Sequence, residues 1–304
     1  MRALVTGSTG FSGIFLGGAL RARGVEVFAV SQRISAPGVT RADLRSEENW
    51  SKLFDEAKPD HVFHLSGVAH AQSLAEFAAH NTLAAAALLD AARAKKFAGA
   101  ILLVGSAAEY GLVPESALPV TESFAASPRT PYGASKYAQT QLALDAVHRG
   151  QRVIVARPSN LIGPSMPTRS AFGSFARQLR EIELGRREAV LQVGDLSAYR
   201  DFIDVRDAVA SYLALALDTA FSGLVNVPSG ELIGMRSALD ALIAAFGMPL
   251  SVRLEQDRTQ LRSGEISKFS ASPALLRSLI GDRTPIDFET SLRDIAAHER
   301  AHVH

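Results

Sequence analysis

The sequence predicts an α/β fold in which a doubly wound parallel sheet is followed by a smaller C-terminal lobe. Short, uniformly apolar runs recur along the chain, as expected of strands that are buried on both faces. Helical stretches separate these runs, so we expect right-handed crossovers and parallel strands. After about residue 160, loops rich in Pro, Ser and Gly alternate with helices, which indicates the second lobe.

The expected strands are apolar runs that stop at glycine or polar residues. The first, Ala3 to Val5, ends at Thr6-Gly7, and the second, Val25 to Val30, follows Arg23-Gly24. The others are Val62 to Leu65, Ala100 to Val104, Val153 to Ala156 and Leu224 to Val227. We expect the last of these to return to the sheet from the second half of the chain.

Helices are expected where apolar residues recur at helical spacing. The first carries Ile14, Leu16, Ala19 and Leu20, and the others cover 47–57, 74–96, 134–148, 170–184, 205–218, 235–246 and 288–301. The stretch from Asn81 to Ala94 is rich in alanine, a good helix former whose small side chain lets another helix approach closely. It is therefore a helix of a subunit interface or one packed against the sheet.

Composition excludes several classes of protein. The 304 residues are 47% hydrophobic and 21% charged, which excludes a disordered or fibrous chain and leaves one large domain or two closely joined ones. The formal net charge of +1 gives no electrostatic reason to expect nucleic acid or an anionic membrane as partner. No apolar stretch approaches the length of a membrane span, and the N-terminus lacks a signal-peptide pattern. We expect a soluble cytoplasmic protein.

The absence of cysteine removes another set of chemistries. Disulfides, thiol catalysis, Cys-ligated zinc and iron–sulfur centres are excluded, so hydroxyls, amines, carboxylates or a cofactor must do the chemistry. We expect no metal site, because the spaced histidines His298, His302 and His304 are better explained as a frayed helix end.

A glycine-rich turn follows the first expected strand and precedes the first helix. Its sequence is Thr6-Gly7-Ser8-Thr9-Gly10-Phe11-Ser12-Gly13. Glycines in this context let the backbone turn tightly and approach a pyrophosphate, whose charge sits at the N-terminus of the following helix. The pattern predicts dinucleotide binding on a Rossmann sheet.

Residues after the second strand bear on the choice of cofactor. Ser31 stands where an NAD site usually carries an acid, and Arg33 follows it. An acid would repel the 2′-phosphate of NADP, whereas Ser and Arg bind it, so NADP(H) is favoured and NAD(H) remains possible. Asp43-Leu44 is either a contact to the adenine or an ordinary helix N-cap.

A tyrosine and a lysine form the expected catalytic pair. Tyr132 and Lys136 lie four apart, on one face of a helix that begins after Pro131. An ammonium near a phenol lowers the pKa of the phenol, which suits proton exchange with a carbonyl or alcohol. Ser106 follows the strand that ends at Val104, at the sheet edge where such folds hold their ligands.

Together these motifs resemble the extended short-chain dehydrogenases/reductases that act on nucleotide-sugars. The matching elements are the turn 7–13, Asp43-Leu44, His64 to Gly67, Asn81, Ser106 before Tyr110-Gly111, Tyr132 with Lys136, and Arg157 to Pro164. The resemblance implies an NADP-binding Rossmann domain over 1–160 and a mainly substrate-binding lobe over 161–304, with elements that return to the first domain. The expected cofactor-binding residues are Gly7, Thr9, Gly10, Phe11, Ser12, Gly13, Ser31, Arg33, Asp43, Leu44, Leu65, Ser66, Gly67, Asn81, Tyr132, Lys136 and Pro158.

Within that family the chain most resembles the reductases of GDP-4-keto-6-deoxy-mannose. The likeness rests on the motifs Asn160 to Pro164, Val193 to Asp195, Arg200 to Asp207, Asn226 to Gly230 and Leu261 to Glu265. Similar dehydratases carry an acid two residues before the tyrosine of their Ser/Thr-x-x-x-Tyr motif. Here that residue is Ala108, which argues against dehydratase activity, although similar reductases often hold an acid there too. If this segment is extended, the nearest acid, Glu109, points to the other side.

The resemblance implies reduction of a 4-keto group. NADPH would give hydride to C4, Tyr132 would donate the proton, Lys136 would hold the nicotinamide ribose, and Ser106 would hydrogen-bond the carbonyl. Asn160, Arg177, Arg200 and Arg262 are the expected substrate-binding residues, with a solvated helix face as the other interpretation of Arg177. For Arg206-Asp207 we favour an ion pair at a helix start over a ligand contact.

Two other functions are compatible with this fold. A nucleotide-sugar 4-epimerase would recycle tightly bound NAD with the same three catalytic side chains. A non-catalytic NADP-sensing protein on this fold would be free to lose the pair Tyr132 and Lys136, which this chain keeps. By resemblance we also expect a homodimer built on the helices at 81–96 and 134–148.

Overall fold

A parallel sheet of seven strands organises the molecule, in the order β11-β6-β5-β4-β1-β2-β3. The computed structural model describes residues 1–249, 252–257 and 266–302. The strands are β1 (Arg2–Thr6), β2 (Glu26–Ser31), β3 (Val39–Arg41), β4 (His61–His64), β5 (Ala100–Val104), β6 (Val153–Pro158) and β11 (Gly223–Val227). Every neighbouring pair is parallel, so the predicted fold class is confirmed.

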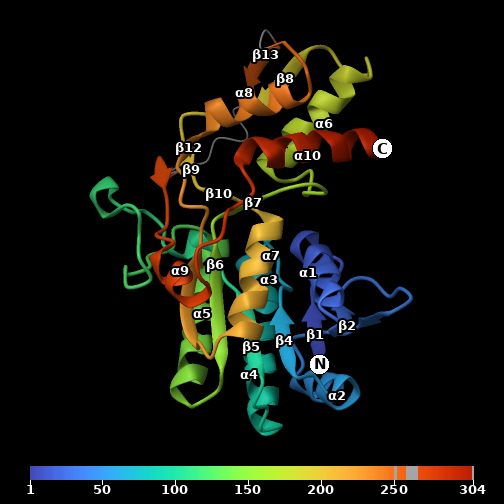
Figure 1. Cartoon of the computed structure of the whole chain (residues 1–304), viewed down its shortest axis with the longest axis vertical. Coiled ribbons are helices and arrows are strands. Elements are labelled where there is room, and N and C mark those ends of the chain that lie inside the picture. Colours follow the sequence, from blue (N-terminus) through green and yellow to red (C-terminus); the bar gives the residue numbers. More distant parts are fainter. Residues whose placement is uncertain (250–251, 258–265, 303–304) are drawn as a thin grey trace.

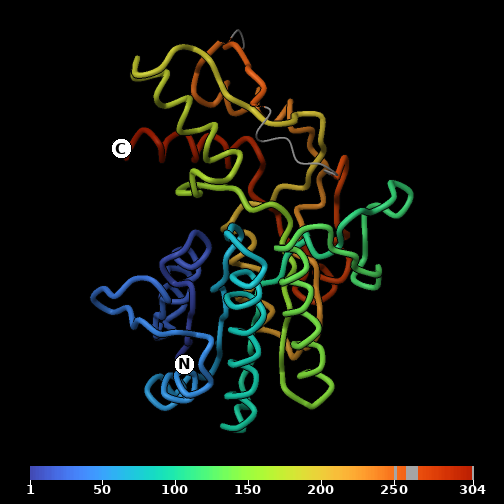
Figure 2. Tube along the Cα trace, turned by 180° about the vertical axis from the view of Figure 1, so that it is seen from behind, coloured from blue at the N-terminus to red at the C-terminus, as the bar shows by residue number. Residues whose placement is uncertain are grey.

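Helices cover both faces of this sheet, because its strands are apolar on both sides. One face packs against α2 (Glu47–Ala57), α4 (Ala84–Ala94) and α5 (Pro131–His148), and α4 and α5 run side by side there (Figure 2). The other face packs against α1 (Phe11–Ala22), α7 (Val205–Leu213), the π-helical η4 (Ala214–Asp218) and α9 (Ala274–Ile280). Thus the second half of the chain returns to the sheet through β11 and also through these last three helices.

The expected helix over 74–96 consists of three pieces in the structure. They are α3 (Leu74–Phe77), the π-helical η1 (Ala78–Leu83) and α4. The wider turn brings Asn81 inward, where its amide donates to the carbonyl of Val68 and to the hydroxyl of Ser135. A buried side chain therefore accompanies the break in the regular helix.

The C-terminal lobe stands beyond the carboxyl ends of the central strands (Figure 1). Its helices are α6 (Ala171–Glu183), α8 (Met235–Ala245) and α10 (Phe288–Ala301), which enclose a separate apolar core. Short strands join them in three small sheets: β7 (Asn160–Ile162) with β10 (Phe202–Asp204), β8 (Val190–Val193) with β13 (Arg253–Gln256), and β9 (Tyr199–Arg200) between β12 (Ile233–Gly234) and β14 (Lys268–Phe269). Phe11, from the glycine-rich turn, packs against this core, so the two lobes meet there.

Buried polar contacts also join the lobes. Asp201 is fully buried, and its carboxylate accepts from the backbone N–H of Ser229 and of Gly230 and from the Ser229 hydroxyl. Ser229 and Gly230 directly follow β11, whereas Asp201 lies between β9 and β10. In the part of the chain that the structure describes, no helix is both long and apolar enough to cross a membrane.

Candidate active site

The predicted motifs follow the carboxyl ends of four central strands. β1, β4, β5 and β6 end at Thr6, His64, Val104 and Pro158, and being parallel they end on the same side. The glycine-rich turn, the loop 65–68, the turn at Ser106 and Asn160 come directly after these ends. The predicted motifs that directly follow these four strands therefore lie on the same side of the sheet, at the carboxyl ends of its central strands.

Backbone packing explains the glycine spacing of the first turn. Gly7 has a φ of 68°, and a Cβ placed on it would lie 2.9 Å from the backbone of Leu65 and Ser66. A Cβ on Gly13 would lie 2.0 Å from the Gly7 carbonyl oxygen. The N-cap of α1 is Gly10, which has no side chain to accept from the first N–H groups of the helix. These groups are thus available to an anionic ligand.

The segment after β2 is held by Ser31. Its buried hydroxyl accepts from the backbone N–H of Arg33 and of Ile34, at 3.3 and 3.2 Å, and Thr9 donates to it at 3.4 Å. The Arg33 side chain is exposed. Ser31 therefore shapes the turn that presents Arg33 beside the glycine-rich turn.

His80 is a residue that sequence reasoning missed in this region. It lies in η1, and its Nδ1 is 3.0 Å from Oε1 of Gln32, the residue that follows Ser31. The contact joins residues 48 positions apart, and only the π-helical turn brings His80 over the end of β2. No spacing in the sequence signals such a contact.

Asp43 and Leu44 differ in their availability to a ligand. Asp43 forms a two-pronged ion pair with Arg45, and the hydrogen bond from Arg45 lowers the pKa of Asp43 to about 2. The Leu44 side chain is fully buried, and its carbonyl accepts from Trp50 Nε1 at 2.8 Å. Because the whole residue is buried, the predicted contact between Leu44 and a cofactor stays a prediction.

Asn81 supports the loop that follows β4. Its Oδ1 accepts from the N–H of Val68, and a Cβ on Gly67 would lie 2.7 Å from that oxygen. Because its amide also donates to Ser135 on α5, Asn81 joins this loop to the helix that carries Tyr132. The polar atoms of Asn81 are engaged within the protein, so its predicted role in cofactor binding stays a prediction.

Tyr132 and Ser106 face each other across two tightly packed turns. Thr130 caps α5 through the N–H of Gly133, and Pro131 occupies the first turn, so Tyr132 lies at the start of the helix. A Cβ on Gly133 would lie 2.5 Å from the carbonyl oxygen of Ala108. This close approach brings the Ser106 side chain within hydrogen-bonding reach of the Tyr132 phenol.

Lys136 is buried behind Tyr132. Its Nζ donates to the carbonyl of Val104 at 2.8 Å and to Gln139 Oε1 at 2.9 Å, and burial lowers the pKa of Lys136 to about 8. The expectation that Lys136 lowers the pKa of Tyr132 is wrong for this structure. Burial raises the pKa of the Tyr132 phenol, the negative charge of Glu109 adds to that rise, and the Ser106 hydrogen bond opposes it.

Glu109 does not lie on an extended segment, so the condition on which its predicted direction depends is not met. Residues Ala107–Glu109 form the 3-10 helix η2, and Ser106 is its N-cap. Glu109 is fully buried and forms an ion pair with Arg157 on β6 at 2.7 Å. Its carboxylate therefore points into the protein interior.

The predicted substrate-binding residues fall in different settings. Asn160 is exposed at the start of β7, with its amide donating to the carbonyl of Asp201. Arg200 ends β9 and donates to the carbonyls of Tyr199 and Ser267. Arg177 is paired with Glu181 one turn along α6, which agrees with the solvated-face interpretation. Arg262 lies outside the described residues.

Arg206 forms an ion pair at the start of α7, though with other partners than its neighbour Asp207. It binds Asp204 and Asp294, at 2.8 and 2.7 Å, whereas Asp207 accepts from the N–H of Ile286. Within the described residues no group of His, Asp and Glu side chains could hold a metal ion. His298 and His302 stack on each other at the end of α10, and His304 lies outside the described part.

Comparisons with known proteins agree with this geometry. Residues 3–227 match the model of the NAD dependent epimerase/dehydratase family. The chain is 33% identical to GDP-6-deoxy-D-mannose reductase of Pseudomonas aeruginosa, over 97% of this chain and 95% of that protein. A solved structure of RMD from Pseudomonas aeruginosa in complex with NADPH has a TM-score of 0.88 and 32% identity, covering 99% of both chains.

An epimerase structure is similar as well. The UDP-glucose 4-epimerase of Thermus thermophilus in complex with NAD has a TM-score of 0.87 and 26% identity, covering 100% of both chains. The similarity to reductases and epimerases thus extends over both lobes.

Proposed function

Because this chain belongs to the NAD dependent epimerase/dehydratase family, we propose that it is an oxidoreductase that uses NADPH to reduce the 4-keto group of a nucleotide-activated 6-deoxy-hexose. GDP-4-keto-6-deoxy-mannose is the substrate that the similarity to the Pseudomonas reductase favours. One observation carries the proposal: Tyr132, with Ser106 in hydrogen-bonding reach and Lys136 behind it, stands at the sheet edge that the glycine-rich turn also reaches.

The residues at this edge fit a dinucleotide. Gly7 and Gly13 close a turn that any Cβ would block, and the free N–H groups at the start of α1 suit a pyrophosphate. Bound NADPH supplies the hydride. Arg33, exposed beside Ser31, suits a 2′-phosphate, which supports NADP(H) over NAD(H) as the preferred cofactor.

The protein's own residues orient the ketone and provide the proton. Ser106 donates to the carbonyl oxygen, and Tyr132 gives its phenolic proton to that oxygen as the alcohol forms. Tyr132 holds its phenolic proton at neutral pH, as an ordinary tyrosine does, and burial raises its pKa further. Lys136, whose Nζ lies at the end of β5, holds the nicotinamide ribose. In the second lobe, Asn160 and Arg200 contact the nucleotide-sugar.

A nucleotide-sugar 4-epimerase is the second candidate, because the Thermus epimerase with bound NAD has the same fold over the full chain. The same three side chains would serve it, whereas the cofactor would be recycled and not consumed. The exposed Arg33 favours the reductase. A dehydratase is disfavoured, because Ala108 holds no ionisable group, and retention of Tyr132 and Lys136 disfavours a sensor.

The decisive experiment incubates purified protein with GDP-4-keto-6-deoxy-mannose and either NADPH or NADH. The absorbance of the reduced nicotinamide is followed over time. We expect oxidation of NADPH that depends on the substrate and is lost in Tyr132→Phe. If no coenzyme is consumed and the protein carries bound NAD after purification, the reductase proposal fails in favour of an epimerase.

A homodimer and a cytoplasmic location remain part of the proposal. The face formed by η1, α4 and α5 exposes Leu83 and Leu142, apolar side chains that a second copy would cover. Sedimentation at micromolar concentration tests the dimer, and a monomer there would count against it.

A further inference from the structure

The carboxylate of Glu109 is surrounded by donors from three parts of the chain. Oε1 accepts from the backbone N–H of Ser106 at 2.8 Å. Oε2 accepts from Thr140 Oγ1 at 2.7 Å and from Arg157 Nε at 2.8 Å, with Arg157 Nη2 at 2.7 Å. The side chains of Glu109 and Arg157 are 0% and 2% exposed, so each contact is made without competing water.

These donors belong to the elements that carry the reacting side chains. The Ser106 N–H belongs to the residue whose side chain opposes the rise in the pKa of the Tyr132 phenol. Thr140 lies on α5, one turn after Lys136 and two turns after Tyr132. Arg157 lies on β6 of the central sheet. One carboxylate thus joins the serine turn, the catalytic helix and the sheet.

The space around Glu109 is closed. A Cβ on Gly105 would lie 2.6 Å from Glu109 Oε1 and 3.2 Å from Arg157 Cγ. The Arg157 guanidinium also stacks on the Tyr110 ring, 4.7 Å from its centroid. Because both members of the ion pair are confined by backbone and aromatic packing, the carboxylate has little freedom to move.

We propose that Glu109 is a positioning residue for the reduction, which fixes the Ser106 turn relative to α5 and so sets the geometry between Ser106, Tyr132 and Lys136. The proposal rests on the proposed function and concerns a residue outside the expected catalytic set. Glu109 touches none of the reacting atoms and acts through the three elements that it joins.

The charge of Glu109 also acts on the site. The titratable and charged groups around it are Arg157 on β6, Tyr110 after η2, Tyr132 and Lys136 on α5, and His64 on β4, which faces Lys136. The negative charge raises the pKa of Tyr132 and opposes the fall in the pKa of Lys136 that burial causes. Removing that charge should therefore lower the pKa of both groups, an effect that a purely structural role would not produce.

Thr140→Val and Thr140→Ser form the matched pair that tests the proposal. Valine keeps the shape but removes the hydrogen bond from α5 to Glu109, whereas serine keeps the hydroxyl. We expect kcat of Thr140→Val to fall about 10-fold with KM for NADPH unchanged, because small misplacements of reacting groups cost rate. Thr140→Ser should recover most of that loss.

Glu109→Gln tests the charge. We expect the alkaline limb of its pH–rate profile to move to lower pH. The same shift should be visible without substrate, as an earlier rise in phenolate absorbance that is missing when Tyr132→Phe is added. If the wild type reduces no keto-sugar, the proposed function fails, while this titration still decides the role of Glu109. If Glu109→Gln does not fold, the test rests on Thr140→Val and Thr140→Ser, compared by kcat and by the titration of Tyr132.

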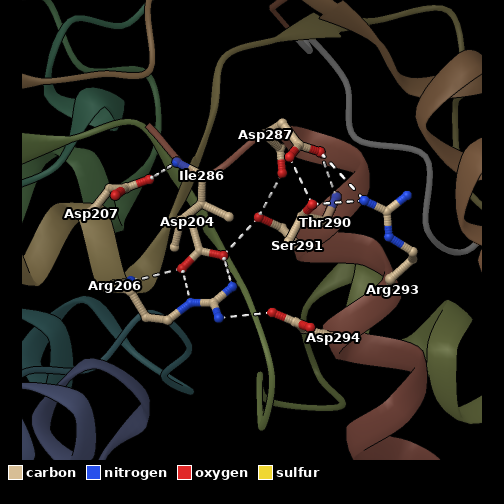
Figure 3. A network of polar contacts seen from close by, with 9 residues as sticks. All are labelled: Asp204, Arg206, Asp207, Ile286, Asp287, Thr290, Ser291, Arg293 and Asp294. Atoms are coloured by element: carbon tan, nitrogen blue, oxygen red, sulfur yellow. Dashed lines mark hydrogen bonds and ion pairs between the residues drawn. The ribbon is translucent and has the colours of Figure 1, made fainter. Parts of the chain in front are cut away.

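Ser291→Ala is the control for loss of a buried hydroxyl. Ser291 donates to Asp204 at 2.6 Å, and Asp204 is ion-paired with Arg206, an arrangement like that of Thr140, Glu109 and Arg157 but located between α7 and α10 (Figure 3). We expect Ser291→Ala to keep wild-type kcat and pH profile. Wild-type kcat in Thr140→Val together with an unchanged Tyr132 titration in Glu109→Gln would overturn the proposal.

Discussion

At the scale of single residues, burial rather than a neighbouring charge governs the protonation of the site. Lys136 and Tyr132 both lose water on folding, and each responds in the direction that favours its neutral form. The phenol stays protonated, and the amine becomes easier to deprotonate. If Lys136 has its proposed role, activity should respond to pH as Lys136, with its pKa lowered to about 8, loses its proton.

The pH dependence of cofactor binding follows from Lys136. Its pKa of about 8 lies below the usual lysine value, so the ammonium is complete well below pH 8 and is lost as the pH rises through that value. If the ammonium holds the nicotinamide ribose, Kd for NADPH should increase on the alkaline side. Fluorescence titration of NADPH across that range measures this, and a Kd independent of pH would contradict it.

Arg33 should decide between the two coenzymes. In Arg33→Ala we expect KM for NADPH to rise about 10-fold, because a charge-assisted contact to the 2′-phosphate is lost. KM for NADH should stay the same. Arg23→Ala is the matched control, since Arg23 is an exposed arginine paired with Asp218 beyond the end of α1. An equal rise in KM for NADPH and for NADH would show that Arg33 does not bind the 2′-phosphate.

Residues with local signatures could be predicted from the sequence, and those that depend on tertiary contact could not. The spacing of Tyr132 and Lys136 and the place of Ser106 after a strand are local. The role of Glu109 depends on Thr140 and Arg157, which are 31 and 48 positions away. Predicting it would have required the 3-10 turn at Ala107–Glu109, which a short Ala-rich segment does not signal.

At the scale of elements, the long helices and the central strands agree with the sequence to within a few residues. α2 covers Glu47–Ala57 as expected, because Ser46 caps it and Trp50, Leu53 and Phe54 bury one face. The π-helical η1 escaped prediction, because its sequence AAHNTL holds a single large apolar residue and so shows no periodicity in which an added residue could be seen. The two- and three-residue strands of the C-terminal lobe are too short for any periodic pattern.

The junction between α7 and α10 provides a prediction on stability. Asp204 caps α7 and binds Arg206 and Ser291, while Asp287 caps α10 (Figure 3). Burial alone would raise the pKa of Asp204, but these hydrogen bonds together lower it below its usual value. Its stabilising contribution is thus complete above the unfolded-state value and is lost as the pH falls through the lower folded value.

Asp204→Asn should reduce the free energy of unfolding by about 1.5 kcal/mol at neutral pH, because charge-assisted hydrogen bonds are lost, while Arg206 is one-third exposed and keeps Asp294. The difference from wild type should shrink in acid, where the wild-type carboxyl also becomes neutral. Urea denaturation at neutral and acidic pH measures both values. A deficit that does not depend on pH would show that the ionised form of Asp204 is not what stabilises the junction.

At the scale of the whole molecule, the chain passes between the lobes several times. β11, α7 and α9 pack on the sheet although they follow the start of the second lobe, and Asp201 binds the segment after β11. The predicted boundary near residue 160 therefore does not mark the end of an independent unit, because later segments pack on the sheet. Composition and periodicity indicate the two lobes, but they do not reveal how often the chain crosses.

We expect the two lobes to unfold together. Trp50 is the single tryptophan and is fully buried against the sheet, so its fluorescence reports on the first lobe. Far-ultraviolet circular dichroism includes the helices of both lobes. The two transitions should coincide in urea, and NADPH should shift both by the same amount. Separate midpoints would indicate lobes that unfold independently.

The position of β11 has a consequence for synthesis on the ribosome. β11 pairs with β6, and Gly223–Val227 leaves the ribosome long after the other six strands. Until then, β6 remains an open edge with the apolar sequence of Val153 to Ala156 exposed for pairing with other chains. The first lobe can therefore complete its sheet only after the later part of the chain has been synthesised. A fragment that ends near residue 160 would keep β6 as an unpaired edge strand.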